Sequence, residues 1–280
     1  MKKIILIIIL VVFGFSAHAL DITNKFMSNL NSYFSDKFPT AEIGLSTGVT
    51  NEVTGSILVV KPLSDPRDNE NIKFTQGSLF LSDDDRETIN LGFGHRKLVN
   101  DDNLLIGYNL FYDHELDYDH QRASIGIEAI SSVGSLRANQ YYGLSGWQTG
   151  LDNVNEKALD GNDVELGMPL PYMPWTNFYL RSFNWEGSDG AADQEGDEIS
   201  LEAKLSGFNI EVGKRSHDGT TEDEEFLKLT WTCCNKKDNE VGISDKAYNL
   251  TSVEDQKFAK VRRQNLIVKQ KEMSLTVIGF

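Results

Sequence analysis

Apolar and polar side chains alternate residue by residue along most of this chain. From position 40 onward, segments such as Leu104–Tyr112 carry an apolar residue at every second position. Gly, Ser, Asn, Glu and Lys fill many of the positions between them. Because successive side chains of a strand point to opposite faces, each segment predicts a strand with one apolar and one polar face. Clusters of Asp, Asn, Gly and Ser separate the segments and predict turns.

The predicted strands are long. We place 12 of them, at 41–49, 54–62, 71–81, 87–98, 103–113, 120–131, 134–145, 160–169, 176–186, 197–206, 207–216 and 224–233. A strand of about 9–11 residues can cross a bilayer when tilted, whereas strands of globular proteins usually have about 5–6 residues. The pattern therefore predicts an all-β fold, a 12-stranded antiparallel transmembrane barrel over residues 40–234.

The connections between the strands alternate in length. If the first strand begins in the periplasm, the outward connections 146–159 and 187–196 are long, and the periplasmic connections 132–133 and 206–207 are short. Outer-membrane barrels show this alternation. The connection 63–70 is a long exception.

Aromatic residues lie near the predicted strand ends, as in the interfacial girdles of membrane proteins. They are Tyr112, Tyr141, Tyr142, Trp147, Tyr172, Trp175, Trp185 and Trp231. A soluble lectin-like sandwich also has alternating strands and is the alternative fold. Strand length and loop alternation favour the barrel.

The first 39 residues differ from the rest of the chain. Lys2 and Lys3 precede the apolar run 4–15 and an Ala-His-Ala site, which predicts a signal peptide over residues 1–19. The run is too short for a spanning helix; a buried N-terminal helix is the alternative. Residues 20–39 repeat apolar side chains at helical spacing and predict a periplasmic lead with a short amphipathic helix.

Composition excludes several classes of function. The 280 residues include 27 basic and 42 acidic side chains, a formal net charge of −15. A protein that binds nucleic acid needs clustered basic residues, so we expect this acidic chain to bind no nucleic acid. Two adjacent cysteines, Cys233 and Cys234, suit neither a disulfide scaffold nor a four-cysteine zinc site. A mean hydropathy of −0.34 excludes a helical multi-span membrane protein.

The stretch Asp113–His120 is the most suggestive chemical cluster. Its Asp and His residues at an outer rim could activate a water molecule, as in barrel hydrolases, or bind a metal. A solvated loop that orders the strand ends is the reading we favour, so we expect no catalytic, cofactor or metal residue. Ion pairs inside the lumen are expected from Arg96, Arg122, Glu128, Arg137, Glu165 and Arg181.

A series of motifs then occurs in one order over Phe34–Trp185. They are Phe38-Pro39-Thr40-Ala41, Val60-Lys61-Pro62-Leu63, Phe74-Thr75-Gln76-Gly77, Ile89-Asn90-Leu91-Gly92-Phe93-Gly94-His95-Arg96, Gly107-Tyr108-Asn109-Leu110-Phe111-Tyr112-Asp113, His120-Gln121-Arg122, Ala138-Asn139-Gln140-Tyr141-Tyr142 and Gly161-Asn162-Asp163-Val164. Val261–Val268 follows the barrel. In this order the motifs resemble the inverse autotransporter β-domain, the barrel of intimin and invasin.

The resemblance implies a 12-stranded outer-membrane barrel whose C-terminal linker passes through the pore toward a passenger. We expect residues 235–280 to be that linker, with no passenger domain in the chain. A terminal strand at 275–280 is the alternative for the tail. The predicted function is a translocator or anchor domain without a resident adhesin. A porin-like or structural barrel is the first alternative, and a hydrolase at the Asp113–His120 rim is the second.

The same resemblance implies the partners. They are outer-membrane lipids, lipopolysaccharide and the barrel-assembly machinery, after export from the cytoplasm. A closed barrel has no free strand edge to pair with another chain, so we expect a monomer.

Overall fold

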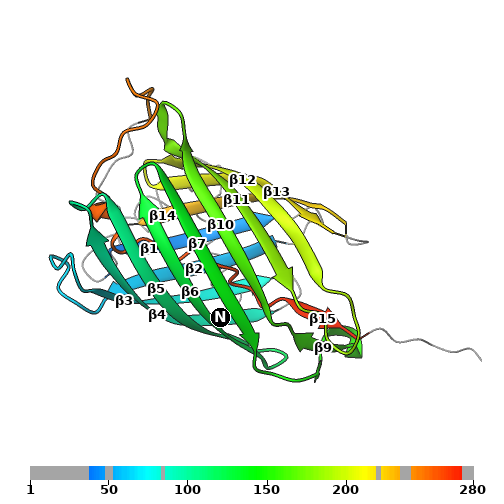
Figure 1. Cartoon of the computed structure of the whole chain (residues 1–280). Coiled ribbons are helices and arrows are strands. Elements are labelled where there is room, and N and C mark those ends of the chain that lie inside the picture. Colours follow the sequence, from blue (N-terminus) through cyan, green and yellow to red (C-terminus); the bar gives the residue numbers. More distant parts are fainter. Residues whose placement is uncertain (1–37, 48–52, 83–85, 219–221, 234–240, 273–280) are drawn as a thin grey trace, which may run out of the picture.

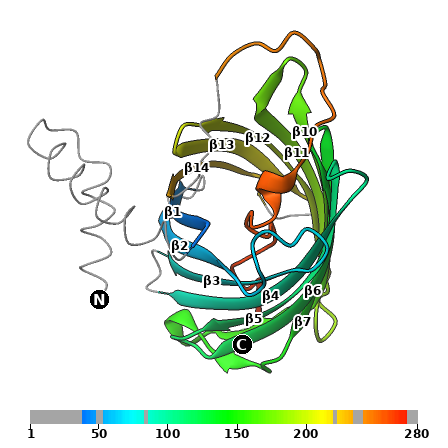
Figure 2. The same cartoon turned by 90° about the vertical axis from the view of Figure 1, so that its left-hand side faces the viewer.

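Twelve long strands close into one antiparallel barrel, in which β1 pairs with both β2 and β14 (Figures 1 and 2). The computed structural model describes residues 38–47, 53–82, 86–218, 222–233 and 241–272. The barrel strands are β1 (Thr40–Thr47), β2 (Val53–Pro62), β3 (Ile72–Ser82), β4 (Glu87–Val99), β5 (Leu104–Glu115), β6 (His120–Ser131), β7 (Gly134–Gly143), β10 (Gly161–Leu170), β11 (Met173–Trp185), β12 (Gln194–Leu205), β13 (Phe208–His217) and β14 (Glu224–Cys233).

The barrel confirms the predicted strands. Each predicted segment overlaps one barrel strand, and the largest shift is three residues, at the starts of β11 and β12. Neighbouring strands pair in chain order around the barrel, except that β7 pairs directly with β10. The reason is that residues 144–160, which connect those two strands, leave the barrel wall and contribute strands to a second, smaller sheet.

Polar side chains face the inside of this barrel and apolar side chains face outward. Leu91 and Ile127 are each 62% exposed, whereas Arg96 and Arg122 are fully buried. In β5, Ile106, Tyr108 and Leu110 are exposed, while Asn109 and Asp113 of the opposite row are buried. A barrel with a lipid-facing apolar surface and a polar lumen has this inverted arrangement.

The two ends of the barrel differ in their connections. At one end lie the tight turns, such as Ser206–Gly207, where Gly207 has φ of +71°, a conformation that glycine adopts without strain. We call it the short-turn end. The other end carries the 144–160 and 186–193 connections and is called the long-loop end.

A second, three-stranded sheet lies at the long-loop end and was not predicted. It consists of β8 (Gln148–Thr149), β9 (Asn155–Ala158) and β15 (Lys269–Lys271), with the 3-10 turn η1 (Leu151–Asn153) between β8 and β9. The elements are too short to produce a visible alternation in sequence. The strand β15 comes from the chain beyond the barrel and pairs with β9.

The chain after the barrel passes through the lumen. In Figure 2 the orange segment first arches outside the ring of strands and then enters it at the 3-10 turn η2 (Glu254–Gln256). We call residues 253–268 the lumen linker. This path agrees with the linker interpretation of residues 235–280. The barrel closes by β1 and β14 without a strand from the tail; residues 275–280 lie outside the described residues.

Some expectations need correction or lie beyond the description. Tyr141 and Trp185 are not girdle residues, because both side chains are buried in the lumen. Residues 1–37, which hold the predicted signal peptide and most of the amphipathic lead, lie outside the described residues, as does Cys234. Among the helical turns in the described ranges, none has the length and apolar character needed to span a membrane.

Candidate functional site: the linker inside the lumen

The lumen linker is anchored first at the short-turn end. The Val253 amide donates to the Asp102 carbonyl in the β4–β5 turn at 2.8 Å. The Lys257 ammonium donates to the Pro66 carbonyl at 2.7 Å and to Asn69 Oδ1 at 2.9 Å. Both acceptors lie in the β2–β3 connection. The connection 63–70, the long exception to the alternation of loop lengths, therefore supplies hydrogen-bond acceptors for the linker.

An apolar patch on the inner wall receives the first part of the linker. Val253, Phe258 and Val261 of the linker belong to one buried cluster with wall side chains. Those wall members are Leu58, Val60, Ile72, Phe74, Leu98, Leu105, Phe111 and Ile130. Burying such side chains stabilises by about 1.5–3 kcal/mol each, so this patch favours an occupied lumen. Its signal in the sequence is the presence of Leu105 and Phe111 in the otherwise polar row of β5.

Two arginines of the wall bind the backbone of the linker. Arg96 of β4 donates from Nη1 to the carbonyls of Lys257 and Ala259, at 2.9 and 2.7 Å. Arg122 of β6 donates to the carbonyls of Gln264 and Leu266, at 2.6 and 3.1 Å. An extended chain cannot satisfy its own peptide groups, and leaving them buried without partners is costly. The guanidinium groups provide these partners.

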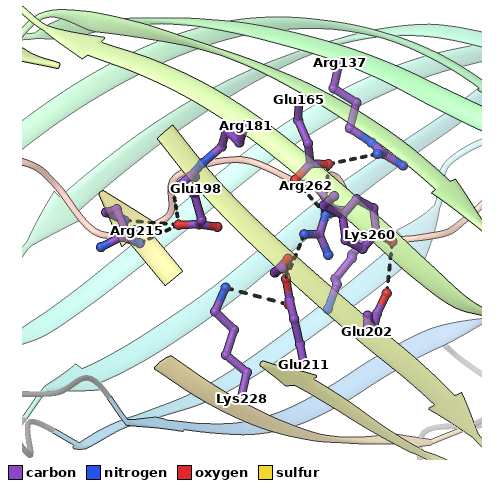
Figure 3. A network of polar contacts seen from close by, with 12 residues as sticks. Arg137, Glu165, Arg181, Glu198, Glu202, Glu211, Arg215, Lys228, Lys260 and Arg262 are labelled. Carbon is purple, nitrogen blue, oxygen red and sulfur yellow. Dashed lines mark hydrogen bonds and ion pairs between the residues drawn. The ribbon is translucent and has the colours of Figure 1, made fainter. Parts of the chain in front are cut away.

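The linker in turn supplies cations to carboxylates of the wall. Arg263 binds both oxygens of Asp113, at 2.8 and 2.6 Å, and Asp113 also accepts from Arg122 at 2.9 Å. Arg262 donates to Glu165 at 3.0 Å and to Glu211 at 3.1 Å, between which it lies in Figure 3. A bidentate arginine–carboxylate pair fixes both position and orientation.

A third linker cation binds near the first strand. The Lys260 ammonium lies 2.6 Å from Glu42 Oε2 of β1. The three linker cations thus reach four different strands, β1, β5, β10 and β13. The linker is thus tied by ion pairs to different sides of the barrel wall.

Aromatic rings support these arginines. The Arg262 guanidinium lies 3.7 Å from the centre of the Tyr179 ring, and that of Arg263 lies 4.4 Å from the Phe111 ring. Tyr141 accepts a hydrogen bond from the Gln264 amide at 2.8 Å and donates to Asp163 at 2.8 Å. Rings next to the charged groups limit access of water and strengthen the ion pairs.

The linker leaves the lumen at the long-loop end. Val268 packs on a cluster of Tyr141, Leu159, Phe183 and Trp185, and its carbonyl accepts from the Leu159 amide at 3.0 Å. The chain then forms β15 against β9, and the Lys269 ammonium binds Glu115. The linker is therefore held along its whole length, from the short-turn end to the long-loop end.

The six lumen residues expected from the sequence form the predicted ion pairs. Arg96 pairs with Glu128 at 2.6 Å and Arg137 with Glu165 at 3.0 Å. Arg181 pairs with Glu198 at 2.7 Å, and Arg122 with Asp113 at 2.8 Å. The sequence analysis did not predict that Asp113 accepts hydrogen bonds both from Arg122 of the wall and from Arg263 of the linker. The adjacent Arg262 and Arg263 in a linker expected to enter the lumen were the available signal.

The residues of the Asp113–His120 rim are divided between the inner and outer faces of the barrel. Asp113 is occupied by two arginines, whereas His120 lies against Glu156 at 3.5 Å. His114 and Asp119 face outward and lie 2.8 Å apart. Hydrogen bonds from Gln121 and then from His114 hold the pKa of Asp119 below its usual range. Asp113 therefore has no histidine partner among the described residues, and the Asp–His pair that the hydrolase alternative would need does not form at Asp113.

The comparison with known families identifies the barrel. The family model described as "Inverse autotransporter, beta-domain" matches residues 15–265. The chain belongs to the inverse autotransporter β-domain family. Family membership confirms the resemblance and makes this an outer-membrane barrel of the translocator and anchor type.

Individual relatives of this inverse autotransporter β-domain are longer proteins. The chain is 30% identical over 155 residues to intimin of Escherichia coli O127:H6, covering 54% of this chain and 16% of intimin. It is 31% identical over 144 residues to the inverse autotransporter adhesin YeeJ of Escherichia coli K12, covering 50% of this chain and 6% of YeeJ. It is 30% identical over 106 residues to invasin of Yersinia enterocolitica, covering 37% of this chain and 12% of invasin. The matches thus span only a part of these relatives.

A solved structure has the same fold. It was reported under "Unveiling the Mechanism Behind the in-meso Crystallization of Membrane Proteins" and matches with a TM-score of 0.69 and 18% identity. The match covers 83% of this chain and all of that one. At this identity the likeness supports the barrel architecture alone.

The contacts around Asp113 predict unequal effects of two substitutions. Asp113→Asn removes the charge that holds two buried guanidinium groups, so we expect the free energy of unfolding to fall by about 3–5 kcal/mol. Arg263→Met leaves Asp113 paired with Arg122, and we expect a loss of about 1–3 kcal/mol. Denaturant titration of the folded barrel measures both values.

His114→Ala is the matched control for these variants, because His114 neighbours Asp113 but faces outward. We expect it to change the free energy of unfolding by less than about 0.5 kcal/mol. Equal losses for Asp113→Asn and His114→Ala would contradict the role of Asp113.

Proposed function

We propose that this barrel anchors the polypeptide that follows its linker and exports it through the lumen to the cell surface. The observation that carries the proposal is the path of residues 253–272, which enter at the short-turn end and leave at the long-loop end. In outer-membrane barrels the short turns face the periplasm and the longer loops face outward. The linker therefore runs in the direction of export.

The lumen suits an extended chain. Beside the linker it retains cavities of about 170 and 200 Å³, which are large enough for water molecules but not for a folded domain. The polypeptide would therefore cross unfolded and fold outside. Once residues 253–268 occupy the lumen, their contacts stop further movement, and the linker becomes an anchor.

The remaining parts of this function are proposed with it. Residues 1–19 would direct the chain across the inner membrane, and the assembly machinery would insert the barrel among lipids and lipopolysaccharide. The β1–β14 pairing leaves the described barrel without a free strand edge, which supports a monomer. The absence of a passenger stays a prediction, because the relatives extend far beyond the matched region.

Surface labelling tests the direction of the linker. An epitope placed after Phe280 should bind antibody on intact cells that express the full chain. The matched control carries the epitope between Ser206 and Gly207, in the β12–β13 turn at the opposite end of the barrel. We expect that epitope to be reached only after permeabilisation. If the epitope after Phe280 also needed permeabilisation in folded barrels, the export proposal would fail.

A second candidate function is a narrow ion pathway past the linker. The two lumen cavities share Glu42, Lys260 and Arg262 as lining residues. The two cavities therefore adjoin at these charged residues, and the Glu42–Lys260 ion pair lies between them. A ring of charged side chains at a constriction controls ion passage in channels.

Conductance in a planar bilayer tests this pathway. We expect the full chain to show a small steady conductance that increases at least about twofold in Lys260→Ser, because the substitution removes the side chain from the junction between the cavities. Lys204→Ser is the control, since Lys204 lines only one cavity. A full chain and a Lys260→Ser variant that both fail to conduct would leave the lumen an anchor alone.

A further inference from the structure

Three donor groups gather where the linker leaves the barrel. Glu115 ends β5, His120 begins β6 directly opposite, and Glu156 lies in β9. Their potential ligand atoms all lie within 4.8 Å of one another. All three side chains are buried, with exposed fractions of 2%, 0% and 0%. The strands and the small sheet thus bring together an imidazole and two carboxylates from positions up to 41 residues apart.

His120 is the unusual member of this cluster. Neither of its ring nitrogens has a hydrogen-bond partner within the described residues, although the side chain is fully buried. Glu156 Oε2 lies 3.0 Å from Arg86 Nη1 in an ion pair, so the imidazole of His120 is the group left without a partner. A buried polar atom without a partner is costly, and a functional ligand is one explanation for such atoms. Imidazole nitrogen is the ligand that most clearly favours zinc and related transition ions over calcium or magnesium.

The spacing of these atoms suits a metal better than a hydrogen bond. His120 Nε2 and Glu156 Oε2 are 3.5 Å apart, which is long for a hydrogen bond. Two ligands bound tetrahedrally to zinc at about 2.0–2.1 Å would be separated by about 3.3 Å. The separation of these two atoms is therefore close to that of two ligands of one zinc ion.

The linker itself supplies the competing cation. Glu115 Oε1 accepts from Arg86 at 2.7 Å, and Glu115 Oε2 binds the ammonium of Lys269, the first residue of β15. Arg86 also donates to Glu156 Oε1 at 3.0 Å. The carboxylate oxygen that a metal would take from Glu115 is therefore the one held by Lys269.

We propose that Glu115, His120 and Glu156 form a site for a zinc-class divalent ion, which binds in place of the Lys269 ammonium. A fourth ligand position would be left for water, as in open zinc sites. The linker cation and the metal are alternative occupants, so metal binding loosens the contact between β15 and the barrel rim. Metal binding is independent of whether the barrel exports a passenger.

Zinc titration of the folded, untagged full chain tests the site, by competition with a chromophoric chelator. All variants carry Cys233→Ser and Cys234→Ser, so that thiols do not contribute. In that background Lys269→Met removes the competing ammonium, and we expect it to bind one Zn²⁺ per barrel about tenfold more tightly than the background chain. Adding His120→Ala to Lys269→Met should reduce the affinity at least about a hundredfold.

Two further variants, also added to Lys269→Met, make the result specific. His120→Gln keeps the bulk of the side chain and should also lose zinc, which covers the case in which His120→Ala fails to fold. His114→Ala removes an exposed imidazole on the same rim and should bind zinc as tightly as Lys269→Met alone. No zinc bound by Lys269→Met, binding retained by both His120 variants, or binding lost in His114→Ala would each overturn the site.

Discussion

The peptide groups of an extended chain inside a barrel need hydrogen-bond partners, and in this lumen side chains of the wall provide them. A strand in a sheet pairs its backbone with a neighbour, but the lumen linker has no neighbouring strand until β15 reaches β9. Arg96 and Arg122 therefore serve as donors to its carbonyls, while Gln76 and Tyr141 accept from its amides at Val261 and Gln264. Buried arginines need counter-charges, which Glu128 and Asp113 provide.

Asp113 joins the two halves of this arrangement. It neutralises Arg122, which holds the linker backbone, and it receives Arg263, which belongs to the linker. Charged groups of the wall and charged groups of the linker thus neutralise each other. Without the linker, Glu42 would lose the ammonium of Lys260, and Glu211 and Asp113 would each lose one of their cations, keeping only Lys228 and Arg122 of the wall. The empty lumen would also expose the apolar patch that Phe258 and Val261 cover. Both effects favour the occupied state, which suits an anchor.

Sequence alone predicted the wall well and the contents of the lumen poorly. Strand positions follow from the period-two alternation, which is a local property, and the structure confirmed them to within three residues. The partners of the linker are contacts between residues far apart in sequence, such as Arg263 and Asp113, 150 positions apart. No local pattern encodes them. The small sheet was missed because β8, β9 and β15 have two to four residues each.

Two misreadings had detectable causes. Tyr141 and Trp185 were assigned to the lipid interface by residue type, although both lie in rows that face the lumen. The rim Asp113–His120 was read as one cluster because its residues are adjacent in sequence. Strand alternation instead sends Asp113 and Glu115 inward and His114 outward. In both cases the face of the strand decides the environment, and the residue type does not.

Hydrogen exchange of the folded full-length barrel tests the central claim most directly. If the wall holds the linker backbone, amides in residues 259–266 will exchange about as slowly as those of β5 and β6, because the Val261 and Gln264 amides are bonded to buried side chains. Exchange of this segment at the rate of an unstructured peptide of the same sequence would contradict the account. The linker would then be a loose occupant of the lumen, and Asp113 would not secure it.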